Sequence, residues 1–156
     1  MKRCSKCKND YPVTEFFLDH RDGSRRSYCR QCSYGICKRY RGTEQGKRHK
    51  KLARKRYRQQ QISFVNELKA LNKCQVCNES CLACLDFHHL GDKDGQVMSF
   101  FTWTKLITEI KKCIVLCCNC HRKKHAGIIT IPNVPLTIPV ELLQKYIQKP
   151  WRVKTI

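Results

Sequence analysis

The fold of this chain is decided by one stretch of its sequence, Cys117-Cys118-Asn119-Cys120-His121-Arg122-Lys123-Lys124-His125. It begins with a C-x-x-C pair, and an earlier C-x-x-C pair, Cys74 and Cys77, lies thirty-nine residues before it. Each such pair folds as a tight knuckle that presents two thiolates, and two knuckles complete the tetrahedron that zinc prefers. We therefore expect a structural Zn2+ on four cysteines, Cys74, Cys77, Cys117 and Cys120.

Two histidines in this stretch are candidate ligands of a second metal ion. His121 and His125 lie four residues apart on what should be a short helix ended by Gly127, so their imidazoles share one face and could chelate one cation. The interval between the two cysteine pairs is too long for a simple finger and must enclose a substructure. It contains His88 and His89 in the run Leu-Asp-Phe-His-His-Leu at 85–90. Neighbours on a strand point to opposite faces, so these two histidines need not bind the same ion.

A further pair of knuckles lies near the start of the chain. Cys4 and Cys7 are separated from Cys29 and Cys32 by twenty-one residues, which is the spacing of a four-cysteine zinc site. The alternative, four buried or redox-active cysteines, is weaker because two matched pairs occur in one basic protein. We expect a second structural Zn2+ here, with Cys37 left as a spare thiol.

The charge of the chain points to a polyanionic partner. Thirty-two Lys and Arg against twelve Asp and Glu give a formal net charge of +20. The positive side chains repel one another unless a polyanion lies near them. Nucleic acid is favoured over an anionic membrane, because no amphipathic helix with a broad apolar face accompanies the charge. No signal peptide is recognised, and the longest apolar run, 113–118, is too short to span a bilayer. We expect no membrane partner and an intracellular, cytoplasmic location, where the thirteen cysteines stay reduced for metal binding.

Composition divides the chain into four segments. Residues 1–37 form the first cysteine module, 38–72 a basic helical linker, 73–127 the second module, and 128–156 an extension with a helix expected at 140–148. The linker is predicted to be one helix, or two in sequence, and an apolar stripe docks its second half on the second module. That stripe consists of Ile62, Val65, Leu68 and Leu71. The pattern predicts a small α+β protein that bound zinc stabilises, because so short a chain has only a small hydrophobic core.

Basic side chains along the first module, the linker and the helix after Cys120 are candidate contacts to nucleic-acid phosphates. Contacts of this kind give salt-sensitive affinity and only modest sequence preference. The candidates are Arg25, Arg26, Arg30, Lys38, Arg39, Arg41, Lys47, Arg48, Lys50, Lys51, Arg54, Lys55, Arg56, Arg58, Arg122, Lys123 and Lys124.

Three separated blocks of the second module carry a resemblance to a known family. They read Cys74-Gln75-Val76-Cys77, Leu85-Asp86-Phe87-His88-His89-Leu90, and, from Glu109 to His125, E-I-x-K-C-x-V-L-C-x-N-C-H-R-x-x-H. With these blocks, residues 74–127 resemble an HNH endonuclease domain of the ββα-metal type. The first module and the linker are similar, more loosely, to the zinc-finger extensions ahead of HNH domains in phage and bacterial proteins. The resemblance implies hydrolysis of double-stranded DNA, as nicks or double-strand breaks, in a bacterial or phage-infected cell.

The resemblance also implies roles for four histidines. His89 would be the general base that takes a proton from the attacking water, while His88, His121 and His125 would hold one catalytic divalent cation. An imidazole that titrates near neutrality can accept such a proton, and a cation offsets the charge that builds on the phosphate. Three imidazoles suit Zn2+, Ni2+ or Mn2+ better than Mg2+, but water and phosphate in open positions could still admit Mg2+. The identity of the metal stays open.

One residue departs from the family pattern, and the roles of a cysteine pair and of an aspartate stay undecided. Lys112 stands where the family's middle asparagine is usual, and since that asparagine braces the loop between the strands, its absence puts the rigidity of the loop in question. Cys81 and Cys84 form a further C-x-x-C that could compete for zinc, although Cys84 is expected in the strand as a small apolar residue. Asp86 either supports a histidine or simply points outward.

Two rival functions stand beside the nuclease. One is a non-catalytic zinc-finger protein that binds nucleic acid, and it predicts tight binding without cleavage that depends on a divalent cation. The other is a dimeric junction-resolving nuclease, which needs paired sites to cut two strands. We expect a monomer, with a dimer left open.

Overall fold

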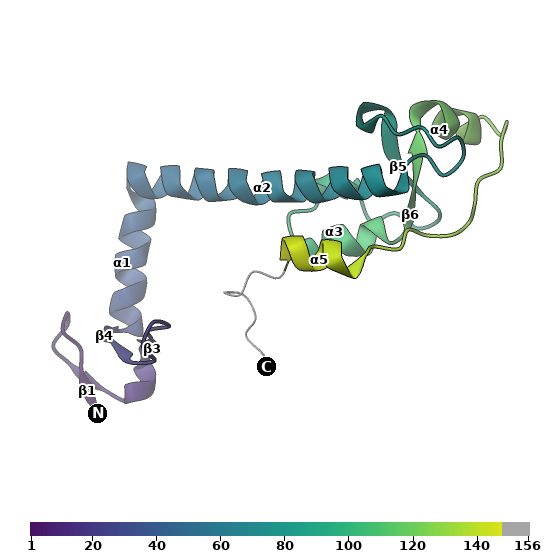
Figure 1. Cartoon of the computed structure of the whole chain (residues 1–156). Helices are drawn as coiled ribbons and strands as arrows, with labels where there is room; N and C mark the ends of the chain where they lie inside the picture. The colour runs from purple at the N-terminus through teal and green to yellow at the C-terminus, as the bar shows by residue number, and fades with distance from the viewer. Residues whose placement is uncertain (148–156) are drawn as a thin grey trace. The chain divides into compact units, whose positions relative to one another are not determined.

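A computed structural model describes residues 1–147, and the chain divides into two compact units, Met1–Lys55 and Arg56–Ile156 (Figure 1). Each unit contains short strands, helices and one of the two four-cysteine groups. The chain is therefore a small α+β protein with two cysteine clusters positioned to bind zinc, as the sequence predicted. Residues 148–156, which include the end of the predicted C-terminal helix, lie outside the described residues. No helix within residues 1–147 has both the length and the apolar character needed to cross a membrane.

The first unit is built from two short hairpins and a helix. Its elements are β1 (Lys2–Arg3), β2 (Asp10–Tyr11), the 3-10 turn η1 (Val13–Glu15), β3 (Phe16–Leu18), β4 (Arg25–Cys29) and α1 (Arg30–Gly42). β1 pairs with β2 and β3 with β4, both antiparallel. The buried core consists of Cys4, Phe16 and Cys29. So small a core contributes little stability by itself, and a metal ion on the four cysteines would add to it.

The segment predicted as one helix or two, residues 38–72, is observed as the end of α1 and the whole of α2 (Glu44–Asn72), and α1 itself begins at Arg30, inside the predicted first module. The break is at Thr43, whose backbone is extended and whose hydroxyl accepts the N–H of Gly46 at 3.0 Å. This is the side-chain cap that threonine supplies at the start of a helix. Only glycine fits at position 46, because a Cβ there would stand 2.0 Å from the carbonyl oxygen of Tyr40.

The second unit has a larger core around one antiparallel hairpin. Its elements after α2 are η2 (Leu82–Cys84), β5 (Leu85–His89), η3 (Val97–Ser99), α3 (Trp103–Ile110), β6 (Cys113–Cys117), α4 (Cys118–His125) and α5 (Val140–Ile147). In the hairpin β5–β6, Leu85 pairs with Cys117 and His89 with Cys113. All of β6 is buried, and α4 follows it directly and packs against both strands. The hairpin and α4 thus bring the histidines of the sequence motifs into one region.

Aromatic rings join α2, α3 and α5 in the second unit. Phe64, buried on α2, meets the edge of Trp103 on α3 at 5.4 Å and of Tyr146 on α5 at 5.7 Å between ring centroids. Such pairs stabilise beyond the apolar area that they bury. Val65 and Leu68 of the predicted stripe lie in the core, but Leu71 is 60 % exposed. The buried part of the stripe therefore ends before Leu71.

The prediction that Cys84 belongs to the strand is wrong. Cys84 is the last residue of η2, and β5 begins at Leu85, whose pairing with Cys117 is the first of the ladder. The 3-10 turn leaves the Cys84 thiol exposed instead of packed. Cys81 is exposed as well, and within residues 1–147 neither thiol belongs to a group of close metal ligands.

Candidate functional site

Two knuckles form the cysteine cluster of the second unit. The first turns back at Asn78, whose φ of 61° is left-handed and whose N–H donates to the Cys74 carbonyl at 2.9 Å. Asparagine adopts this backbone conformation more readily than most residues. The second knuckle starts α4, where the Cys117 sulfur accepts the N–H of Cys120. As a result, the sulfurs of Cys74, Cys77, Cys117 and Cys120 all lie within 4.8 Å of one another.

The spacing of these sulfurs fits a tetrahedral zinc ion. Zn–S bonds of about 2.3 Å place tetrahedral sulfurs about 3.8 Å apart, and the sulfurs of Cys77 and Cys117 are 3.6 Å apart. The first unit repeats the knuckle: Lys8 has a φ of 64°, and its N–H donates to the Cys4 carbonyl. Its cluster consists of Cys4, Cys7, Cys29 and Cys32. Both clusters can therefore hold a structural zinc ion, as predicted.

The thiols of each cluster ionise unequally. Burial alone would raise the pKa of Cys74, but the N–H groups of Cys117, Cys77 and Val76 lower it to about 6. Burial and the three neighbouring thiols raise the pKa of Cys120 to about 12. Four thiols so close together ionise fully only when a cation offsets their charge. This donor set is therefore that of a metal site.

A second group of ligands joins β5 to α4. His88 on β5 and His121 and His125 on α4 have ring nitrogens within 4.8 Å of one another, and the rings of His88 and His121 are 4.9 Å apart between centroids. Burial, followed by the charges of His121 and His125, lowers the pKa of His88. A neutral imidazole keeps the lone pair that a metal ligand needs. The structure thus brings the three predicted ligands together.

Asp86 lies beside this histidine group. Its Oδ2 is 3.8 Å from Nδ1 of His121, and its side chain is 52 % exposed. Carboxylates next to a ligating histidine orient its ring by attracting the ring N–H. At 3.8 Å the two side chains are close enough for electrostatic attraction but too far apart for a hydrogen bond, so both roles weighed from the sequence stay open.

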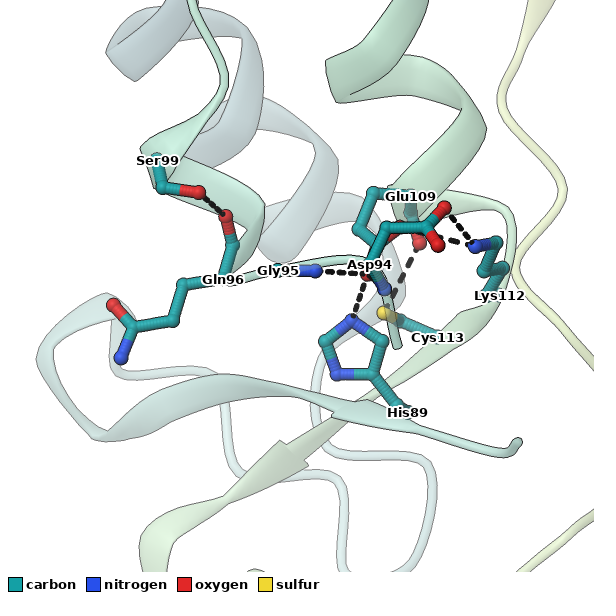
Figure 2. A network of polar contacts seen from close by, with 8 residues as sticks. All are labelled: His89, Asp94, Gly95, Gln96, Ser99, Glu109, Lys112 and Cys113. Carbon is teal, nitrogen blue, oxygen red and sulfur yellow. Dashed lines mark hydrogen bonds and ion pairs between the residues drawn. The ribbon is translucent and has the colours of Figure 1, made fainter. Parts of the chain in front are cut away.

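His89, the next residue of β5, has a different partner, as Figure 2 shows. Its Nε2 is 2.9 Å from Oε1 of Glu109 on α3, which is 1 % exposed. Burial alone would raise the pKa of Glu109, but donors from Gly95, Lys112, Asp94 and His89 hold it below its ordinary value. An ionised carboxylate only accepts hydrogen bonds, so Nε2 of His89 carries the proton of this contact, and in the neutral ring Nδ1 is then the nitrogen with the lone pair. The neighbouring histidines of β5 therefore engage different groups, as strand alternation predicted.

The same carboxylate braces the loop after β5 (Figure 2). Oε1 of Glu109 accepts the N–H groups of Asp94 at 3.0 Å and Gly95 at 3.3 Å. The Lys112 ammonium lies 2.6 Å from the Asp94 carboxylate and 3.2 Å from Oε2 of Glu109. The Lys112 carbonyl also accepts the N–H of Leu90. Lys112 thus contacts both the loop and the buried carboxylate that binds it.

Replacing Glu109 with alanine is expected to destabilise the second unit by about 3 kcal/mol, because the buried donors that bind its carboxylate lose their acceptor. Those donors come from His89, Asp94, Gly95 and Lys112. Urea unfolding of the zinc-loaded protein, followed by circular dichroism, should show a lower midpoint. Glu141→Ala, at an exposed position of α5, is the matched control and should stay within about 0.5 kcal/mol of the parent. A parental midpoint for Glu109→Ala would mean that the network does not stabilise the fold.

The candidate phosphate contacts fall into two sets. The Arg58 guanidinium donates to the carbonyls of Met98 and Phe100, and Arg25 donates to the carbonyl of Phe16 at 2.8 Å. These two arginines stabilise the fold, because a guanidinium bound to carbonyls has fewer donors left for phosphate. The exposed candidates are Arg26, Arg30, Lys38, Arg39, Arg41, Lys47, Arg48, Lys50, Lys51, Arg54, Lys55, Arg56, Arg122 and Lys123, while Lys124 is half-buried.

The sequence analysis assigned no contact to Glu109, although Glu109 begins the third motif block, and it treated Lys112 only as a departure from the family pattern. Their spacing of three residues, at which opposite charges can meet, is the signal that could have joined them. The contacts with His89 and Asp94 arise only when α3 packs beside the end of β5. No family model, no curated protein and no solved structure matches this chain. What the site does is therefore inferred from its own geometry.

Proposed function

We propose that the chain is a metal-dependent HNH endonuclease that hydrolyses phosphodiester bonds in double-stranded DNA. The observation that carries the proposal is the meeting of three imidazoles within 4.8 Å, next in the chain to a histidine held by a buried carboxylate. A metal group and an oriented imidazole are the two parts that such hydrolysis needs. The order of elements, β5, β6 and then α4, with the histidines on β5 and α4, agrees with the ββα-metal resemblance.

The residues of the site divide the chemistry between them. His88, His121 and His125 would hold a divalent cation, which when bound offsets the charge that develops on the phosphate and on the leaving oxygen. His89 accepts the proton of the attacking water at Nδ1. The Glu109 carboxylate accepts the Nε2–H of His89, which fixes the orientation of the ring and keeps Nδ1 free.

Exposed basic side chains hold the DNA in this proposal. Arg122 and Lys123 lie on α4 between the two helix histidines, close enough in the chain to contact phosphates beside the cut. The exposed lysines and arginines of α1 and α2 add further phosphate contacts. Such contacts neutralise the backbone without reading bases, so binding is expected to weaken steeply as salt rises.

Plasmid cleavage in the presence of Mg2+, Mn2+, Zn2+ or Ni2+ tests the proposal. The parent should nick or linearise supercoiled DNA with at least one of these ions. His125→Ala should lower the rate about a hundredfold, because it removes one ligand of the cation. His125 is exposed, so the change spares the core, and His20→Ala, at an exposed histidine of the first unit, is the matched control. No cleavage with any ion, or a parental rate for His125→Ala, would contradict the proposal.

A non-catalytic zinc-finger protein is the second candidate. It is favoured by one observation: the two cysteine clusters and the exposed basic residues of α1 and α2 lie outside the histidine group, so nucleic-acid binding through them would not need it. It predicts that DNA is bound but never cut with any of the four ions. Sedimentation of the protein without DNA tests the dimeric junction-resolving alternative, because it measures the oligomeric state. A strict monomer argues against that alternative, since it does not present the paired sites needed to cut two strands.

A further inference from the structure

Aromatic side chains of β3 and α1 meet at the surface of the first unit. Phe16 and Cys29 are partners in the ladder, and both are buried in the core of the cysteine cluster. The register of the ladder shifts between Phe16 and Leu18, and Phe17 lies in this irregular stretch, half-buried and outside that core. Tyr28, one residue before Cys29 on β4, is 40 % exposed.

The start of α1 adds to the same surface. Tyr34 meets Phe17 edge-on, with ring centroids 5.5 Å apart, and is 62 % exposed. The Arg30 guanidinium lies 5.2 Å from the centroid of the Phe17 ring. We call Phe17, Arg30 and Tyr34 the aromatic face. None of the three belongs to the buried core of the zinc cluster, so that core does not account for the exposed ring of Tyr34.

The charge around the aromatic face selects its partner. Residues 25–42, which form β4 and α1, carry six basic side chains and no Asp or Glu. These basic residues are Arg25, Arg26, Arg30, Lys38, Arg39 and Arg41. A surface that combines an open aromatic ring with an excess of positive charge complements a ligand that is both flat-ringed and polyanionic. Single-stranded nucleic acid has both properties, whereas in a duplex the base faces are already stacked.

We propose that the aromatic face stacks unpaired nucleobases of a single strand, while the neighbouring arginines hold its phosphates. Base stacking on aromatic side chains tolerates any sequence, because every base has a π-face. Tyr34 is the main platform, since it is the most exposed ring of the face. This binding goes beyond the nuclease activity and does not depend on it. It predicts a preference for nucleic acid that carries unpaired bases.

Fluorescence anisotropy on the full, zinc-loaded chain tests the proposal, with His89→Ala as the background so that DNA is not cut. The probes are a labelled single strand of about twelve nucleotides, an abasic strand of the same length, and the matching duplex. The base-bearing strand should bind about tenfold more tightly than the abasic strand, which has the same phosphates and no rings. Tyr34→Ala should abolish most of that difference and leave the salt dependence unchanged, because phosphate contacts remain.

Two matched variants separate stacking from other effects. Tyr34→Phe keeps a ring and should bind like the parent, and Leu52→Ala removes an exposed apolar side chain of α2 and should also bind like the parent. Zinc content checks that the first unit stays folded. Equal affinity for base-bearing and abasic strands, or parental binding by Tyr34→Ala, would overturn the proposal. So would binding to phosphatidylserine vesicles that depends on Tyr34 in the absence of any base preference.

Failure of this proposal and failure of the nuclease proposal are read from different measurements. Stacking is judged by affinity in a background that does not cut. Cleavage is judged by plasmid nicking with the parental face intact. Either proposal can therefore fail while the other stands.

Discussion

Cleavage of supercoiled plasmid by His89→Ala is expected to be about a thousandfold slower than by the parent, because a positioned general base contributes about 10²–10⁴-fold. Alanine cannot accept the proton of the attacking water. The three imidazoles that would hold the cation lie elsewhere on β5 and α4, and both cysteine clusters are untouched. The initial nicking rate at saturating divalent cation is the measurement. Zinc content and DNA affinity, measured in parallel, should stay close to the parental values.

His89→Gln separates proton transfer from positioning. A glutamine amide can still donate to the Glu109 carboxylate and so keep the brace on the loop, but it does not accept a proton near neutral pH. Both variants should cut equally slowly, while the urea midpoint of His89→Gln should stay nearer to that of the parent. If His89→Gln cuts at the parental rate, His89 is a positioning residue of the loop and not the base.

Cys74→Ser is expected to abolish cooperative folding of the second unit. Serine is a poor zinc ligand near neutral pH, because its hydroxyl stays protonated, and apparent zinc-binding energies of about 10–16 kcal/mol exceed the stability of most small domains. The Cys74 sulfur is buried and lies with the three other sulfurs of its cluster. Thermal unfolding followed by circular dichroism, together with zinc content after dialysis, measures the effect. Retained zinc and a parental transition would show that the cluster does not stabilise the fold.

Cys81→Ser is the matched control for this change. It alters a thiol in the same unit that is exposed and stands outside the ligand groups found among residues 1–147. Zinc content and the unfolding transition should match the parent within about 0.5 kcal/mol. A loss of zinc in Cys81→Ser would instead mean that the Cys81 and Cys84 pair competes for the ion.

Features that depend on spacing along the chain were predictable. The two cysteine pairs of each cluster are local knuckles, and their thiols meet as expected. His121 and His125 share a helix that ends where glycine was expected to end it. Gly127 has a φ of 71°, and the N–H groups of Gly127 and Ile128 donate to the carbonyls of Lys124 and Lys123. These are contacts within a few residues, for which backbone geometry alone sets the distances.

Contacts between distant segments were not predictable in the same way. The sequence pointed to Arg58 as a phosphate contact, but the fold brings it to the carbonyls of Met98 and Phe100. It also left Lys112 as a departure from the family pattern, whereas the fold makes it a brace of the loop. In each case the partner lies in a segment whose approach depends on how the helices pack.

The sequence by itself determined which side chains can bind metal and which carry charge, because ligand chemistry and short spacings are properties of the local chain. Only the tertiary structure decided that Glu109 engages His89, that Asp86 stands beside His121, and that the rings of Phe17 on β3 and Tyr34 on α1 meet. These arrangements join residues that pairing and packing bring together, and neither composition nor periodicity sets the distances between them.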